Sequence, residues 1–163
     1  MNKLTNYLKK AKFWNMVLLV FGAVNGVMSL VEVPAIFNPE TPVDMNNPSL
    51  ANVTDPAIIH TVEKSLAILA NPFYQFYTIV MLLISLVLVA TFFQNHHRFA
   101  RGKAVMVWPY YLQVFKLVLA VVASFLTGSA LISPTLTLTT FCLNGAWALP
   151  AVLVLYYLKQ SIK

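Results

Sequence analysis

Charged residues are scarce in this sequence, and acidic ones are the scarcest of them. Only 10% of the 163 residues are charged, with five acidic residues against eleven lysines and arginines. Soluble domains carry about a quarter charged residues, whereas 59% of this chain is hydrophobic. One soluble core of this size cannot hide so much apolar surface from water. The composition therefore predicts a protein that is solvated largely by lipid.

Cysteine and histidine, which carry much of redox and metal chemistry, are also rare. The single cysteine, Cys142, excludes an internal disulfide and a CxxC pair, and it is too few for a zinc site built on thiolates. A haem held within a membrane by one chain needs two facing histidines. His60, His96 and His97 all lie outside the long apolar runs. We therefore expect no cofactor and no metal site within this chain.

Pairs of catalytic residues are missing from the apolar runs as well. Ser85, Ser124 and Ser129 have no histidine or aspartate in these runs that could act as their base. No glycine-rich phosphate loop occurs. Proton and cation transport generally use a carboxylate inside the membrane, and Glu32 falls at the outer edge of a run. We expect that the chain is not an enzyme, and a small cation exchanger is disfavoured.

The charges that do occur are segregated along the sequence. All five acids lie between residues 32 and 63, whereas nine of the eleven basic residues lie within 3–12, 98–103 and 159–163. Short cytoplasmic segments of membrane proteins are enriched in lysine and arginine. The pattern predicts a multi-pass protein of the cell membrane with both termini in the cytoplasm. It does not resemble the basic face of a nucleic-acid-binding protein, so no nucleic-acid partner is expected.

The apolar runs predict an all-α integral membrane protein, with four transmembrane helices in one bundle that forms a single domain over residues 1–163. Each run is long enough to cross a hydrocarbon core of about 30 Å at 1.5 Å per residue. The predicted spans are residues 13–33, 73–93, 110–131 and 136–158, joined by an outer loop at 34–72 and a cytoplasmic loop at 94–109.

Two amphipathic segments lie outside these predicted spans. Residues 1–12 have the pattern of a short interfacial helix on an anionic leaflet, and a simple positively charged anchor is the alternative. In the outer loop, Asp55 is a suitable N-cap and Pro56 a suitable first helical residue. About fifteen residues follow, which is too short to cross a bilayer. We expect a short amphipathic helix that lies on the outer surface.

Small residues at helical spacing mark two faces where neighbouring helices can approach closely. Gly22 and Gly26 form a GxxxG pair in the first span, and Ala120, Ala123 and Thr127 fall within one sector of the third. Small residues let helix backbones meet in a membrane. We predict that both sets are helix-packing residues, and that the GxxxG pair packs within the chain rather than across a dimer.

Lys116 is the one basic residue that the sequence places inside a predicted span, on the small-residue face of the third helix. A lysine near the bilayer centre costs roughly 2.5–3.5 kcal/mol on insertion scales. It lies six residues after Tyr110, where the span is predicted to begin. Two interpretations remain open: the ammonium can snorkel to the cytoplasmic headgroups, or it can belong to a polar site within the bundle.

Such an intramembrane polar site would include the amides on neighbouring positions of the predicted bundle. Gln113 flanks the same face as Lys116, and Asn25 and Asn144 lie inside the first and fourth spans. No acidic residue of the chain falls at the depth of Lys116. An anionic partner would therefore be a lipid phosphate, a ligand or another subunit.

Three classes of function fit these observations. We expect an accessory subunit, assembly factor or modulator of a larger membrane complex, which acts by helix–helix interaction. Its partners would be the lipid bilayer and either other membrane protein subunits or further copies of itself. One alternative is an oligomeric transporter or channel component with Lys116 lining a path. A second alternative, based on layout alone, is a membrane immunity protein against a pore-forming toxin.

Overall fold

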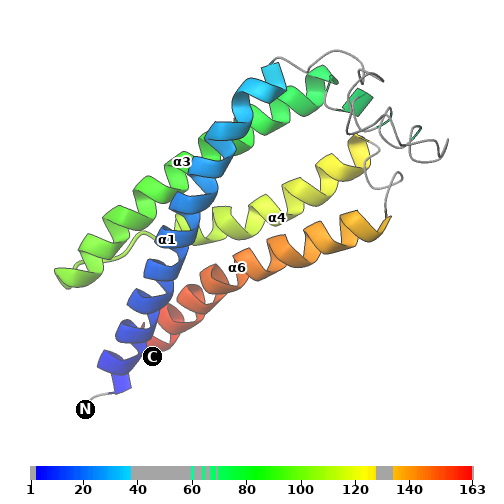
Figure 1. The fold of residues 1–163 in the computed structure, drawn as a ribbon. Coiled ribbons are helices and arrows are strands. Elements are labelled where there is room, and N and C mark those ends of the chain that lie inside the picture. Colours follow the sequence, from blue (N-terminus) through cyan, green and yellow to red (C-terminus); the bar gives the residue numbers. More distant parts are fainter. Residues whose placement is uncertain are drawn as a thin grey trace.

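The fold is entirely helical over the part of the chain that the structure describes. The computed structural model describes residues 3–37, 60, 64, 67–68, 70–127 and 134–162. These residues form four long helices and no strand (Figure 1). The helices are α1 (Lys3–Phe37), α3 (Pro72–Ala100), α4 (Trp108–Leu126) and α6 (Pro134–Ile162). The predicted all-α architecture is confirmed.

Three of these helices have the length and composition of membrane spans. Among the described residues these are Leu4–Val31 within α1, Pro72–Ala100 and Trp108–Leu126. The protein is therefore membrane-embedded through three apolar helices. The predicted fourth span, residues 136–158 within α6, is not among them, so the predicted count of four is not reproduced. Parts of α6, including the side chain of Asn144, lie outside the described residues to which this comparison is limited.

Two helix boundaries differ from the prediction: the start of α1 and the end of α3. The predicted interfacial helix at 1–12 is instead the first part of α1, because neither glycine nor proline separates it from the apolar run. Likewise α3 continues to Ala100, so the predicted loop at 94–109 is helical at its start. After α3 ends, the chain turns at Gly102, whose φ of +63° favours glycine.

The outer ends of the helices are described only in part. Asn71 caps α3, since its side-chain oxygen accepts a hydrogen bond from the Phe73 N–H at 2.8 Å. α4 ends at Leu126, five residues before the predicted end of that span, and the Thr127 N–H that follows donates to the Ala123 carbonyl at 2.9 Å. The predicted amphipathic helix of the outer loop falls largely outside the described residues.

The central helix of the bundle is α1. It packs extensively along both α3 and α6, and α4 packs along α6, whereas α3 and α4 share few contacts. Figure 1 shows α1 crossing between α3 and α6. Around the bundle the helices therefore follow the order α3, α1, α6, α4, and α4 meets α3 again to close the ring. The seam between α3 and α4 is the least packed of the seams that join neighbouring helices.

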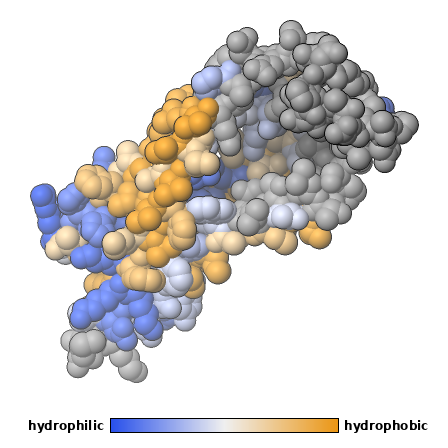
Figure 2. Space-filling model, in the orientation of Figure 1, coloured by the Kyte–Doolittle hydropathy of each residue, from blue (hydrophilic) through white to orange (hydrophobic). Residues whose placement is uncertain are grey.

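The apolar core lies toward the end of the bundle where both termini are found (Figure 1). It is built from the first half of α1, the second half of α3, the start of α4 and the end of α6. Figure 2 shows hydrophilic residues gathered at this end, beyond an apolar band. We call it the basic end. The buried residues of the core are Ala11, Leu18, Leu88, Phe92, Tyr110, Ala151 and Val154.

A buried polar network joins α1, α3 and α4 inside this core. The Tyr110 hydroxyl donates to Asn15 Oδ1 at 2.7 Å and accepts from Asn95 Nδ2 at 3.0 Å. Asn15 Nδ2 donates to the Phe92 carbonyl at 3.0 Å. Asn95 also exchanges hydrogen bonds of 2.8 and 2.9 Å with the backbone of Met106. Asn15, Asn95 and Tyr110 are fully buried, so the network fixes the position of α4 against the other two helices.

Tyr110→Phe tests the contribution of this network to stability. The substitution keeps the ring, which stacks on Phe92 at 5.6 Å, but it removes the donor to Asn15. We expect the free energy of unfolding to fall by about 1 kcal/mol, measured by SDS titration of the purified protein in micelles. Tyr111→Phe is the matched control, because its side chain is 63% exposed. Equal losses in the two variants would contradict a role for the network.

Candidate functional site

The start of α4 fixes the depth of Lys116. Pro109 and Tyr110 are buried in the first turn of the helix, where they anchor it against the core. Lys116 follows Trp108 by eight residues in a 19-residue helix. At 1.5 Å per residue it lies about 12 Å along α4. Lys116 is therefore close to the middle of the helix, and deeper than the predicted start at Tyr110 implied.

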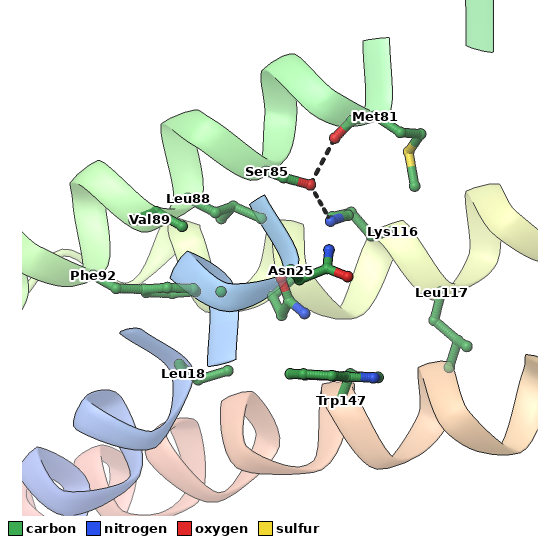
Figure 3. A pocket seen from close by; sticks show the side chains of 12 residues that line it. Leu18, Asn25, Met81, Ser85, Leu88, Val89, Phe92, Lys116, Leu117 and Trp147 are labelled. Carbon is green, nitrogen blue, oxygen red and sulfur yellow. Dashed lines mark hydrogen bonds between the residues drawn. The ribbon is translucent and has the colours of Figure 1, made fainter. Parts of the chain in front are cut away.

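The ammonium of Lys116 is bonded to α3. Its Nζ donates to Ser85 Oγ at 2.7 Å, and Ser85 Oγ in turn donates to the Met81 carbonyl at 2.7 Å (Figure 3). Ser85 is buried and Lys116 is half-buried. Ser85 is thirteen residues from the start of the 29-residue α3. The pair thus connects the middle of α3 to the middle of α4 across their loosely packed seam.

Lys116 and Ser85 border a cavity of about 90 Å³ to which all four helices contribute. Its polar lining consists of Asn25 from α1, Ser85 from α3, and Gln113 and Lys116 from α4, with the indole of Trp147 from α6 (Figure 3). The apolar wall toward the basic end is shared with the core, through Leu18, Leu88 and Phe92. The cavity therefore begins where the close-packed core stops.

No carboxylate faces this cation in the part of the chain that the structure describes. None of the described side chains is a carboxylate, because all five acids fall between residues 32 and 63 of the sequence. The nearest of them along a described helix, Glu32, is seven residues beyond Asn25 in α1. Seven residues correspond to about 10 Å of helix. Ser85 supplies a neutral acceptor to the ammonium but no counter-charge.

Three of the four residues predicted for an intramembrane polar site, Lys116, Gln113 and Asn25, are brought to one cavity. Asn144 belongs to α6, but its side chain is outside the described part. Ser85 was not predicted for the site. Its signal in the sequence was present, since it is the one polar residue between Thr78 and Thr91. Trp147 was not predicted for the site either, because an aromatic side chain within an apolar run fits contacts with lipid or with other helices equally well.

The predicted helix-packing residues of α1 face α3. A Cβ atom on Gly22 would lie 3.1 Å from Val89 Cγ2, and one on Gly26 would lie 3.9 Å from Leu86 Cδ2. The absence of a side chain at Gly22 therefore permits a close approach between the helices. It also leaves room for the cavity, which Gly22 lines.

The predicted helix-packing residues of α4 follow one another along its second half. Ala123 is buried and Ala120 is half-buried. The Thr127 hydroxyl donates to the Ala123 carbonyl at 2.8 Å, within its own helix.

Other chemically active side chains lie apart from the cavity. Cys142 is an exposed free thiol on α6, and His96 and His97 are neighbours near the end of α3. Among the described residues, no three His, Cys, Asp or Glu side chains lie together as a metal site would require. The chain matches no protein-family model, no curated protein and no solved structure. The cavity geometry is therefore the basis for the function proposed below.

A double-mutant cycle on Lys116→Met and Ser85→Ala tests whether the ammonium stays in the bundle. We expect a coupling free energy of about 0.6–1.7 kcal/mol, the range for hydrogen bonds between membrane helices, measured by SDS unfolding. The control cycle pairs Lys116→Met with Ser124→Ala, whose hydroxyl donates to Val121 in its own helix. Coupling near zero in both cycles would support snorkelling to the headgroups instead.

Proposed function

We propose that this chain is a small multi-pass membrane protein that acts by binding inside the bilayer, as an accessory subunit, assembly factor or modulator of a larger membrane complex. The observation that supports this is the cation at Lys116, held at mid-height beside a polar cavity. Charged residues at such depth are costly and are found where they serve a function. The anionic group that completes the site then comes from another component of the membrane.

The lateral surface of the bundle limits where specific recognition can occur. The small-residue pair of α1 is already used against α3 within the chain. Less than a quarter of each apolar span is buried, 17%, 22% and 17% for α1, α3 and α4. This large apolar surface suits lipid and protein neighbours equally. Specificity would therefore come from the seam between α3 and α4, where Lys116 and Ser85 lie.

An oligomeric transporter or channel component is the second candidate. Polar side chains from three helices around one cavity favour it, because a path for a solute needs such a lining. At about 90 Å³ the cavity is well below the 300–1,000 Å³ of pockets for drug-sized ligands. A single cavity of this size is a binding point, and transport would need additional copies or an opening of the seam.

The orientation with both termini in the cytoplasm is part of this proposal. Both chain ends lie at the basic end of the bundle (Figure 1), where the lysines of α1 and Arg98 of α3 also lie. The bias of lysine and arginine toward the cytoplasm supports this placement. It requires that α6 crosses the bilayer beside α1 and α4. A protease should remove a tag on either terminus from the cytoplasmic side only, and removal of the C-terminal tag from outside would contradict the placement.

Purification from native membranes tests the binding function. We expect wild-type protein and Lys116→Arg, which keeps the charge, to retain a stoichiometric membrane protein partner in mild detergent. Lys116→Met should reduce the retained partner about tenfold, which corresponds to 1.4 kcal/mol. Lys103→Met is the control, because Lys103 is an exposed residue of the loop between α3 and α4. Quantitative mass spectrometry provides the measurement.

Two results of that purification would contradict the proposal. The first is equal retention of a partner by all four proteins, which would show that Lys116 takes no part. The second is the absence of any stoichiometric partner together with solute flux in liposomes that contain this protein alone. That combination would favour the transporter.

A further inference from the structure

The cavity contains hydrogen-bond donors in excess of acceptors. An ammonium carries three N–H donors, and Lys116 uses one of them on Ser85. Ser85 directs its own proton to the Met81 carbonyl, so it presents only an acceptor to Lys116. Two N–H bonds of the ammonium are therefore not accounted for by this pair. They lie at the edge of the cavity that Lys116 lines.

The two amides around the cavity add donors from other directions. Asn25 on α1 and Gln113 on α4 each bring a side-chain NH₂ group with two donors, together with one carbonyl oxygen that accepts. Neither side chain is hydrogen-bonded to another residue within the described part of the chain. Trp147 on α6 brings an indole N–H. Figure 3 shows Lys116, Asn25 and Trp147 around the same space. Side chains that carry donors thus line one cavity from three helices, with a single positive charge among them.

This arrangement fits one small oxyanion. We propose that the cavity binds a phosphate-class oxyanion, carried by an anionic membrane lipid or present as free phosphate. The proposal rests on the binding function inferred above and specifies its ligand. Lysine is a common phosphate ligand, which it binds as a compact point charge. Among the described residues, no arginine and no carboxylate lines the cavity.

The volume and the apolar wall of the cavity restrict the ligand further. The cavity of about 90 Å³ is well below the 300–1,000 Å³ of pockets for drug-sized ligands. This volume suits a single small oxyanion group better than a nucleotide or a sugar. Leu18, Leu88 and Phe92 close the side toward the core and give the oxyanion no further polar contact. The cavity therefore favours a charged group that carries few other polar atoms.

A lipid phosphate can reach this depth. Lys116 lies about 12 Å along α4 from Trp108, which is less than half of a hydrocarbon core of about 30 Å. The seam between α3 and α4 is loosely packed, and Val118 and Leu86 are exposed on these two helices. Acyl chains can lie against such apolar side chains while the phosphate meets the ammonium. Free phosphate would use the same donors but would have to arrive with water.

Trp147 provides a reporter for the test. Trp14→Phe and Trp108→Phe leave Trp147 as the only tryptophan of the chain. This protein is placed in phosphatidylcholine nanodiscs, and the emission of Trp147 is recorded in two arms. The first arm titrates inorganic phosphate against chloride at equal ionic strength. The second arm raises the fraction of phosphatidic acid in the nanodisc. Circular dichroism confirms that each variant is helical, and native mass spectrometry of the wild-type chain counts retained phospholipid independently of the tryptophan changes.

We expect a saturable change of emission in one of the two arms, which then identifies the source of the oxyanion. Lys116→Met should weaken binding about tenfold or more, a change of at least 1.4 kcal/mol. Lys116→Arg should retain binding, and Lys103→Met should leave it unchanged. In native mass spectra, Lys116→Met should also lose a phospholipid that the wild-type chain retains if the lipid arm is the one that responds.

Silence in both arms, or an equal response of wild type and Lys116→Met, would overturn the proposal. Failure of the oxyanion proposal can be told apart from failure of the proposed binding function. If a protein partner is retained in a Lys116-dependent manner while both arms are silent, only the oxyanion is wrong. If the oxyanion binds but no partner copurifies, the site stands and the accessory role fails.

Discussion

The charge of Lys116 in the middle of this bundle is unfavourable in free energy, and the polar residues around it reduce that penalty. A lysine at the centre of a membrane helix is unfavourable by roughly 2.5–3.5 kcal/mol on insertion scales. One hydrogen bond to Ser85 offsets part of it, since such bonds average about 0.6 kcal/mol between membrane helices. The amides of Asn25 and Gln113 make the local surroundings polar. The part of the insertion cost that these contacts do not offset is the physical reason to look for an anion from outside the chain.

The two ends of the bundle serve different purposes in this arrangement. Toward the basic end, Tyr110 joins Asn15 and Asn95 inside a close-packed core, so the start of α4 is held firmly against α1 and α3. Beyond that core, α3 and α4 have few contacts, and the Lys116–Ser85 pair connects them beside the cavity. A fixed base with a looser seam above it can admit a ligand without disturbing the packing that sets the depth of Lys116.

The sequence predicts the class of the fold well, because long apolar runs and segregated charges follow directly from the bilayer as solvent. Composition along single helices also indicated that Lys116, Gln113 and Asn25 are unusual. Their common cavity depends on how helices are rotated and tilted, which no single helix encodes. Asn95 was assigned to a loop because QNHHRFARGK reads as polar, although tertiary contacts extend α3 through it. The fourth span is not reproduced among the described residues, and parts of α6 lie outside them.

Solid-state NMR in bilayers tests most directly whether the cation stays in the bundle. Protein labelled with ¹⁵N in lysine side chains and ¹³C in serine reports lysine–serine proximity, and Lys116 with Ser85 is the bonded pair. The account predicts a through-space coupling between a lysine Nζ and a serine Cβ that disappears both in Ser85→Ala and in Lys116→Met. If no such coupling exists and the ammonium of Lys116 is coupled only to headgroups at the surface, Lys116 snorkels and the central claim is wrong.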